Sequence, residues 1–204
     1  MLLHGFLTRH RTQSTVDALR IQSCPAMVDA QESPSEFLQF SIAVYGESTV
    51  SDDCLWLQDE FGIDVNFLLF VLFCGHRGYA ITVDDIERLE NHLRPWRENV
   101  VRPMRRVRRW LKQQTNYADV DTIRQPLLAL EIECEKRQQR MMESLLSPQG
   151  APSGQVAAAN AVRYLAACGV RRSTAVVDRL AAVLCAIFPG LSNADAKTLL
   201  QQAS

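Results

Sequence analysis

The side chains best suited to hold a small ligand lie close together in one part of the sequence. Asp59, Asp64 and Asn66 fall within eight residues of one another, and His76 follows ten residues after Asn66. Carboxylates and amides bind polar ligands, and a histidine can transfer a proton near neutral pH. These four residues form the candidate ligand-binding site. No residue is assigned a catalytic role, because no base and nucleophile occur at a recognisable spacing.

A structural explanation competes with this site. Asp64 stands where a helix N-cap belongs, since its carboxylate can accept hydrogen bonds from the N–H groups of Asn66 or Phe67. Asn66 would then lie in the first turn of a buried helix, where its amide needs partners from a neighbouring element. His76 falls in a glycine-rich segment that we expect to be a loop. The sequence leaves both explanations open.

A second candidate site is basic. The candidate macromolecule-binding residues share one face of a predicted helix and are Arg102, Arg105, Arg106, Arg109 and Lys112. Such a face can bind a phosphate backbone or an acidic protein surface. It can also pair within the molecule, with acidic residues from 47–90 or with the carboxylates of 131–135. No helix-turn-helix pattern accompanies it.

Several chemistries are excluded because their motifs are missing. The Glu-x-x-His pattern of di-iron helices does not occur, since Phe73 stands three residues before His76 and Leu89 three before His92. There is no P-loop, no G-x-G-x-x-G and no G-x-S-x-G. None of the six cysteines forms a Cys-x-x-Cys pair, so we expect reduced thiols. We therefore expect no metal and no cofactor.

Composition indicates an ordinary globular protein. The 204 residues are 47% hydrophobic and 22% charged, and the net charge of −1 favours neither nucleic acid nor anionic lipid. The charge is unevenly spread: residues 47–90 hold ten acidic and two basic residues, whereas residues 94–112 hold eight basic residues and one acid. Oppositely charged segments can pair within one molecule. Reduced thiols and the lack of a clear signal peptide predict a cytoplasmic location.

The element expected to position these residues is a central helix over about 64–75. It combines the Asp64 cap with the most apolar run of the chain, FLLFVLFC at 67–74. A helix that is apolar on every side is buried on every side. The segment from Asp64 to Cys74 is about 16 Å long, at about 1.5 Å per residue, which is too short to span a membrane. A buried strand is the main alternative, but the cap and the helical neighbours favour a helix.

Around this element we predict an all-α bundle of seven to eight helices. Residues 1–33 are expected to be a disordered extension, with Met27 as an alternative native start to Met1. Residues 34–146 form the predicted helical core domain. Residues 147–154 (SPQGAPSG) read as a linker. Residues 155–204 are expected to add Ala-rich helices that pack on the core.

A sequence resemblance agrees with this fold. The pattern has a phenylalanine-rich helix ending in a tyrosine, then Leu-Gln-Asp, a glycine, and Asp-Val-Asn before an apolar run. Its residues here are Phe37, Phe40, Ser41, Tyr45, Leu57, Gln58, Asp59, Gly62, Asp64, Val65, Asn66, Leu68, Leu69 and Phe70. It continues through Pro95, Trp96, Arg97, Val101, Arg102, Pro103, Arg105 and Arg108. Over roughly residues 35–170 the chain thus resembles a bacterial family of uncharacterised small helical proteins, and this resemblance implies no activity.

Three functions remain open. The first is a non-enzymatic regulatory or adaptor protein that binds another macromolecule. The second is a nucleic-acid-associated protein that uses the basic helix Arg102 to Lys112. The third is a small-ligand binder or enzyme that uses Asp59, Asp64 and Asn66. Ion pairs from Arg105, Arg106 and Arg109 to acidic helices would weaken the second. A deep pocket lined by Asp59, Asn66 and His76 would favour the third.

Overall fold

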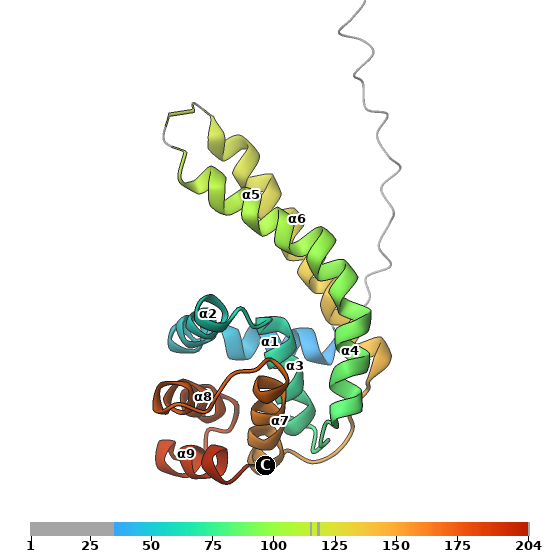
Figure 1. Cartoon of the computed structure of the whole chain (residues 1–204), viewed down its shortest axis with the longest axis vertical. Helices are drawn as coiled ribbons and strands as arrows, with labels where there is room; N and C mark the ends of the chain where they lie inside the picture. Colours follow the sequence, from blue (N-terminus) through green and yellow to red (C-terminus); the bar gives the residue numbers. More distant parts are fainter. Residues whose placement is uncertain (1–34, 115, 118, 204) are drawn as a thin grey trace, which may run out of the picture. The chain divides into compact units, whose positions relative to one another are not determined.

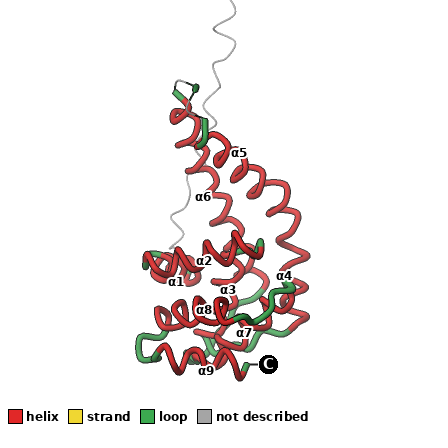
Figure 2. The backbone as a smooth tube through the Cα atoms, turned by 60° about the vertical axis from the view of Figure 1, so that its left-hand side comes forward, coloured by secondary structure: helices red, strands yellow, loops and turns green. Residues whose placement is uncertain are grey.

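The computed structural model describes residues 35–114, 116–117 and 119–203, and every regular element among them is helical (Figure 2). The elements in chain order are α1 Glu36–Tyr45, α2 Ser48–Phe61, α3 Val65–His76, α4 Val83–Trp96, the π-helical η2 Arg97–Val101, α5 Arg102–Lys112, α6 Val120–Leu145, α7 Gly154–Ala167, α8 Thr174–Ile187 and α9 Asn193–Gln202. Because α4, η2 and α5 follow one another without a break, the described part of the chain forms eight continuous helices. The predicted all-α architecture is confirmed. The expectations for residues 1–33 lie outside the described residues.

The central helix is α3, one residue later than predicted at each end. Asp64 is its N-cap, and its nine residues from Phe67 to Gly75 are all buried. The apolar run therefore packs against other helices on every side, as its composition requires. In the described ranges, no helix combines the length and the apolar character needed to cross a bilayer.

Helix α7 lies directly against α3 (Figure 1). Gly75 makes the close approach possible, because a Cβ there would lie 2.2 Å from the Cα of Ala157. The fully buried Asn160 of α7 then binds the backbone around α3: its Nδ2 donates to the carbonyls of Val71 and Tyr79, and its Oδ1 accepts from the N–H of Ile81. These contacts fix α7 beside the central helix.

Two prolines, Pro95 and Pro103, lie within the continuous helix formed by α4, η2 and α5. The hydrogen-bond register changes between them, since the N–H of Arg102 donates to the carbonyl of Arg97, five residues earlier. This π-helical turn and the first turn of α5 accommodate the missing N–H of Pro103. The side chain of Asn99 donates to the carbonyl of Pro95 at 2.7 Å. The prolines therefore shift the helical register without ending the helix.

Helices α5 and α6 lie side by side as a hairpin that extends away from the other helices (Figures 1 and 2). At its base, the Nε1 of Trp96 donates to the carbonyl of Cys134 at 3.0 Å. The part of the hairpin nearest this base faces α1, α2 and the N-terminal end of α3. That placement creates the cavities described next.

Candidate functional site

Asp64 uses both of its carboxylate oxygens inside the protein. Oδ1 accepts from the N–H groups of Asn66 at 2.9 Å and Phe67 at 3.3 Å, which caps α3. Oδ2 accepts from the Nε2 of Gln138 at 2.6 Å and lies 3.6 Å from the Nη1 of Arg97. The side chain is only 9% exposed. Asp64 therefore serves first to position α3 against α6 and η2.

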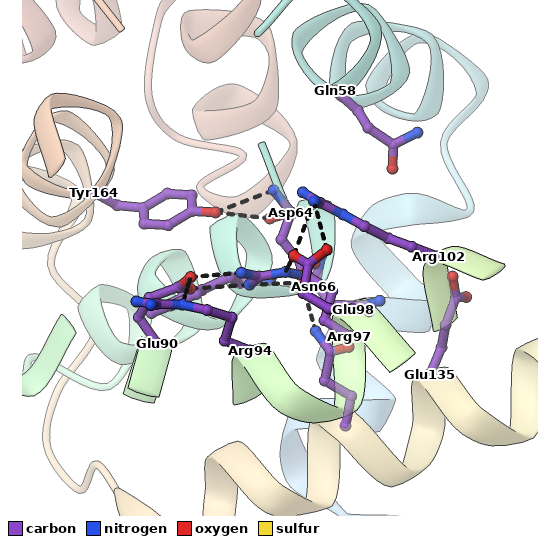
Figure 3. Close-up of polar contacts among 12 residues, drawn as sticks. Gln58, Asp64, Asn66, Glu90, Arg94, Arg97, Glu98, Arg102, Glu135 and Tyr164 are labelled. Carbon is purple, nitrogen blue, oxygen red and sulfur yellow. Dashed lines mark hydrogen bonds and ion pairs between the residues drawn. The ribbon is translucent and has the colours of Figure 1, made fainter. Parts of the chain in front are cut away.

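The backbone of Asp64 is held by Tyr164 of α7. The tyrosine hydroxyl accepts from the N–H of Asp64 at 3.1 Å and donates to its carbonyl at 3.2 Å (Figure 3). Burial raises the pKa of Tyr164 well above its ordinary value, so the phenol stays protonated and can donate. A residue 100 positions away thus fixes the start of the central helix.

Arg97 is almost completely buried and binds Glu90 through two nitrogens. Its Nη1 and Nη2 donate to the two carboxylate oxygens of Glu90 at 2.9 and 2.5 Å (Figure 3). The hydrogen bonds from Arg97 hold the pKa of Glu90 below its ordinary value, although burial opposes this shift. The two hydrogen bonds to Glu90 fix the position of the Arg97 guanidinium group.

The arginines of α5 bind carboxylates of α6 and α2. Arg105 pairs with Glu131 and Glu135, and Arg108 donates to Glu131 at 2.5 Å. Burial alone would raise the pKa of Glu131, but the hydrogen bonds from Arg108 and Arg105 lower it. Burial raises the pKa of Glu135 even though Arg105 opposes the shift. Glu131 and Glu135 are thus internal partners of the basic helix, whereas Glu133 pairs with Lys136.

Two further arginines of α5 make exposed pairs. Arg109 lies 3.3 Å from Asp59 of α2, and Arg102 lies 2.8 Å from Glu98. Among the described residues, Arg106 and Lys112 have no ion pair. Within this basic face, Arg105 is therefore held by carboxylates of α6, whereas Arg106 and Lys112 make no ion pair with the described residues.

Most of the predicted site residues meet in one cavity, which we call the basic pocket. It has a volume of about 510 Å³. Its lining includes the predicted residues Asp59, Asp64, Asn66, Arg102, Arg105, Arg106 and Arg109, together with Gln58, Arg97 and Gln138. Residues of both candidate sites thus line a single cavity. Gln138 could not be found from the sequence, since it lies 74 residues from Asp64 and belongs to no motif.

His76 and Lys112 do not line this pocket. His76 was expected in a loop but is the last residue of α3, at the opposite end from Asp64. Its ring packs between those of Phe40 and Phe188, at centroid distances of 5.4 and 5.7 Å. Burial and the charge of Arg77 lower its pKa. It therefore belongs to an aromatic cluster.

A second cavity of about 580 Å³, which we call the apolar groove, lies between α1 and α2 on one side and the α5–α6 hairpin on the other. Its apolar lining consists of Leu38, Ile42, Tyr45, Leu55, Val65, Leu69, Leu128 and Ile132. Gln58, Asn66, Arg105 and Arg109 line both cavities. The groove and the basic pocket are therefore neighbours on one surface.

Comparison with curated proteins and with solved structures finds no match. Residues 36–142, more than half of the chain, match a family described as "Protein of unknown function (DUF2390)". The match ends within α6, short of the residue 170 to which the resemblance was expected to extend. Every residue that lines the basic pocket or the apolar groove falls inside it. The chain belongs to this family of proteins of unknown function.

Proposed function

We propose that this protein is a non-enzymatic, cytoplasmic regulatory or adaptor protein that binds an amphipathic helix of another protein in the apolar groove. The observation that carries this proposal is the exposure of large aliphatic side chains there. Ile42 is 63% exposed and Ile132 is 42% exposed, and they face the groove from opposite walls. Grouped, exposed aliphatic side chains of this kind mark interaction surfaces.

The spacing of the lining residues suits a helix. On α1, Leu38, Ile42 and Tyr45 follow one another at intervals of four and three residues, so they form a stripe along one face. On α6, Leu128 and Ile132 are four residues apart and form the opposite stripe. Apolar stripes on facing helices can take the apolar face of an amphipathic helix.

The charges at the groove favour an acidic partner. Its acids, Glu131 and Glu135, are already bound to Arg105 and Arg108. Arg109 is 51% exposed and Lys136 is half-buried, and the acids that pair with these two lie outside the groove. The rim is therefore net positive. A helix with leucines on one face and glutamates beside them would match both features.

The nucleic-acid alternative has less support. Binding a phosphate backbone needs several free cations along one face. Arg105 and Arg108 are held by buried or half-buried carboxylates of α6. Replacing these carboxylates by phosphates would leave Glu131 buried without a partner, which is unfavourable.

A peptide-binding measurement tests the proposal. The probe is a fluorescent helical peptide with leucines at positions i, i+3 and i+7 and glutamates at its flanks, followed by anisotropy. We expect saturable binding that weakens about tenfold in Ile42→Ser and in Ile132→Ser, since each change removes an aliphatic contact. Val83→Ser is the matched control, because Val83 is exposed on α4 outside the groove.

Two results would contradict the groove assignment. One is binding of the acidic peptide that is equally strong in the wild type and in Ile42→Ser. The other is equal binding of a peptide in which lysines replace the glutamates, since the positive rim should repel it.

A further inference from the structure

We propose that the basic pocket binds a phosphate group carried by a small molecule. This inference concerns the pocket lined by Asp64, Asn66 and the arginines of α5, and it does not depend on a helix occupying the apolar groove.

The polar groups left available in the pocket are mainly donors. The Oε1 of Gln58 already accepts from the Nη1 of Arg105 at 2.8 Å, and the Oδ1 of Asn66 accepts from the Nε2 of Gln139 at 2.8 Å. Arg105 has only donors, so it fixes the orientation of the Gln58 amide. In the described part of the chain, the Nε2 of Gln58 and the Nδ2 of Asn66 have no hydrogen-bond partner. Both amides therefore offer N–H groups to a ligand.

The carboxylate of Asp64 does not change this balance. Both of its oxygens accept hydrogen bonds, from the start of α3 and from Gln138, and Arg97 stands beside it. Its negative charge is thus already compensated by neighbouring groups of the protein. A ligand that meets the floor of the site encounters amide nitrogens and guanidinium groups, and one acceptor, the Oε1 of Gln138, which is buried without a partner among the described residues.

One wall of the pocket is a row of arginines. Arg102, Arg106 and Arg109 are spaced by four and three residues, which places them on one face of α5. Arg106 makes no ion pair within the described residues, and the pairs of Arg102 and Arg109 are exposed and therefore weak. Guanidinium groups bind phosphate oxygens in a bidentate manner. A phosphate can recruit these side chains without breaking a buried ion pair.

The charge and the size of the pocket agree with this ligand class. Five arginines but only two aspartates line it. Asp59 is the one acid that opposes an anion, and its side chain is 63% exposed and free to turn into solvent. The volume of about 510 Å³ falls within the range of small-molecule sites and exceeds a single phosphate. The ligand therefore carries a second phosphate or an organic group.

Calorimetric titration with inorganic pyrophosphate at low ionic strength tests the site in the full-length protein. We expect one saturable site whose affinity falls about tenfold in Arg106→Ala, through the loss of a charge-assisted contact. Asp59→Asn should bind more tightly than the wild type, because it removes the opposing charge. Lys112→Ala is the control, since Lys112 is a cation on the same helix outside the pocket and should leave the affinity unchanged.

The gain of affinity in Asp59→Asn keeps the test decisive, because a damaged fold cannot produce it. The proposal is overturned if pyrophosphate shows no saturable binding, or if Lys112→Ala weakens it as much as Arg106→Ala does. A second arm identifies the source of the phosphate. Sedimentation with phosphatidylglycerol–phosphatidylcholine vesicles that is lost in Arg106→Ala assigns a lipid headgroup. Pyrophosphate binding without vesicle binding assigns a soluble phosphorylated molecule.

Discussion

Asn66 and Gln139 join α3 to α6 through a single hydrogen bond between their amides. The Nε2 of Gln139 donates to Asn66, while its Oε1 is buried with no partner. Gln139 is only 7% exposed. If either amide were removed, water could not easily reach the other to replace the hydrogen bond. The contact therefore depends on both amides.

Replacing Asn66 by leucine should lower the free energy of unfolding by about 1–3 kcal/mol, since it leaves the Gln139 amide buried and unpaired. Urea denaturation of the variant measures this loss. The same substitution at the exposed Asn116 is the control and should change stability little. Equal unfolding midpoints for N66L and N116L would show that the Gln139 amide finds another partner.

At the scale of elements, Glu90 and Arg97 hold α4 to the π-helical turn that follows it. The two residues are seven positions apart, or about two helical turns, and their bidentate contact spans the proline at position 95. The hydrogen bonds from Arg97 lower the pKa of Glu90 relative to its ordinary value of 4.5. A group whose pKa is lower in the folded state stabilises that state only while it is ionised.

Glu90→Gln should therefore be less stable than the wild type at neutral pH, and the difference should shrink as the pH falls below 4.5. Melting temperatures recorded between neutral and acidic pH give this difference directly. Glu87→Gln, an exposed change on the same helix, should follow the wild type throughout. A gap between E90Q and the wild type that stays constant down to the lowest pH would rule out this ionic contribution.

At the scale of the whole molecule, the close contact of α3 and α7 connects the family-matched segment to the C-terminal helices. Gly75 allows this contact, and Tyr164 and Asn160 then reach across it to Asp64 and to the backbone of residues 71–81. The position of the pocket floor thus depends on a helix that contributes no lining residue. Backbone lies opposite Gly75, so no side-chain rotation can make room there.

Gly75→Ala should destabilise the protein by about 3 kcal/mol, at the upper end of the range for overpacked cores. Its Cβ would meet the backbone of Ala157 and force the helices apart. Gly190→Ala is the matched control, because nothing lies within 4 Å of a Cβ there. Thermal unfolding compares the two variants, and similar melting temperatures would mean that α7 can shift without loss of packing.

The central helix could be predicted because its signals are local. The Asp64 cap acts on the N–H groups two and three residues later, and the apolar run by itself requires burial. The basic face of α5 was predictable for the same reason, since residues three or four apart share a face of any helix. The sequence alone therefore determined the helices, the buried centre and both sets of candidate residues.

Only the tertiary structure decided which of these residues meet. Arg105 and Arg108 bind Glu131, whereas Glu133, two residues away, pairs with Lys136 on another face. Gln138 and Tyr164 reach Asp64 from 74 and 100 residues away, and the ring of His76 packs between those of Phe40 and Phe188. Helix formation depends on interactions within one or two turns, but these pairings depend on how whole helices cross. That crossing is set by packing of the entire core, which no single stretch of sequence specifies.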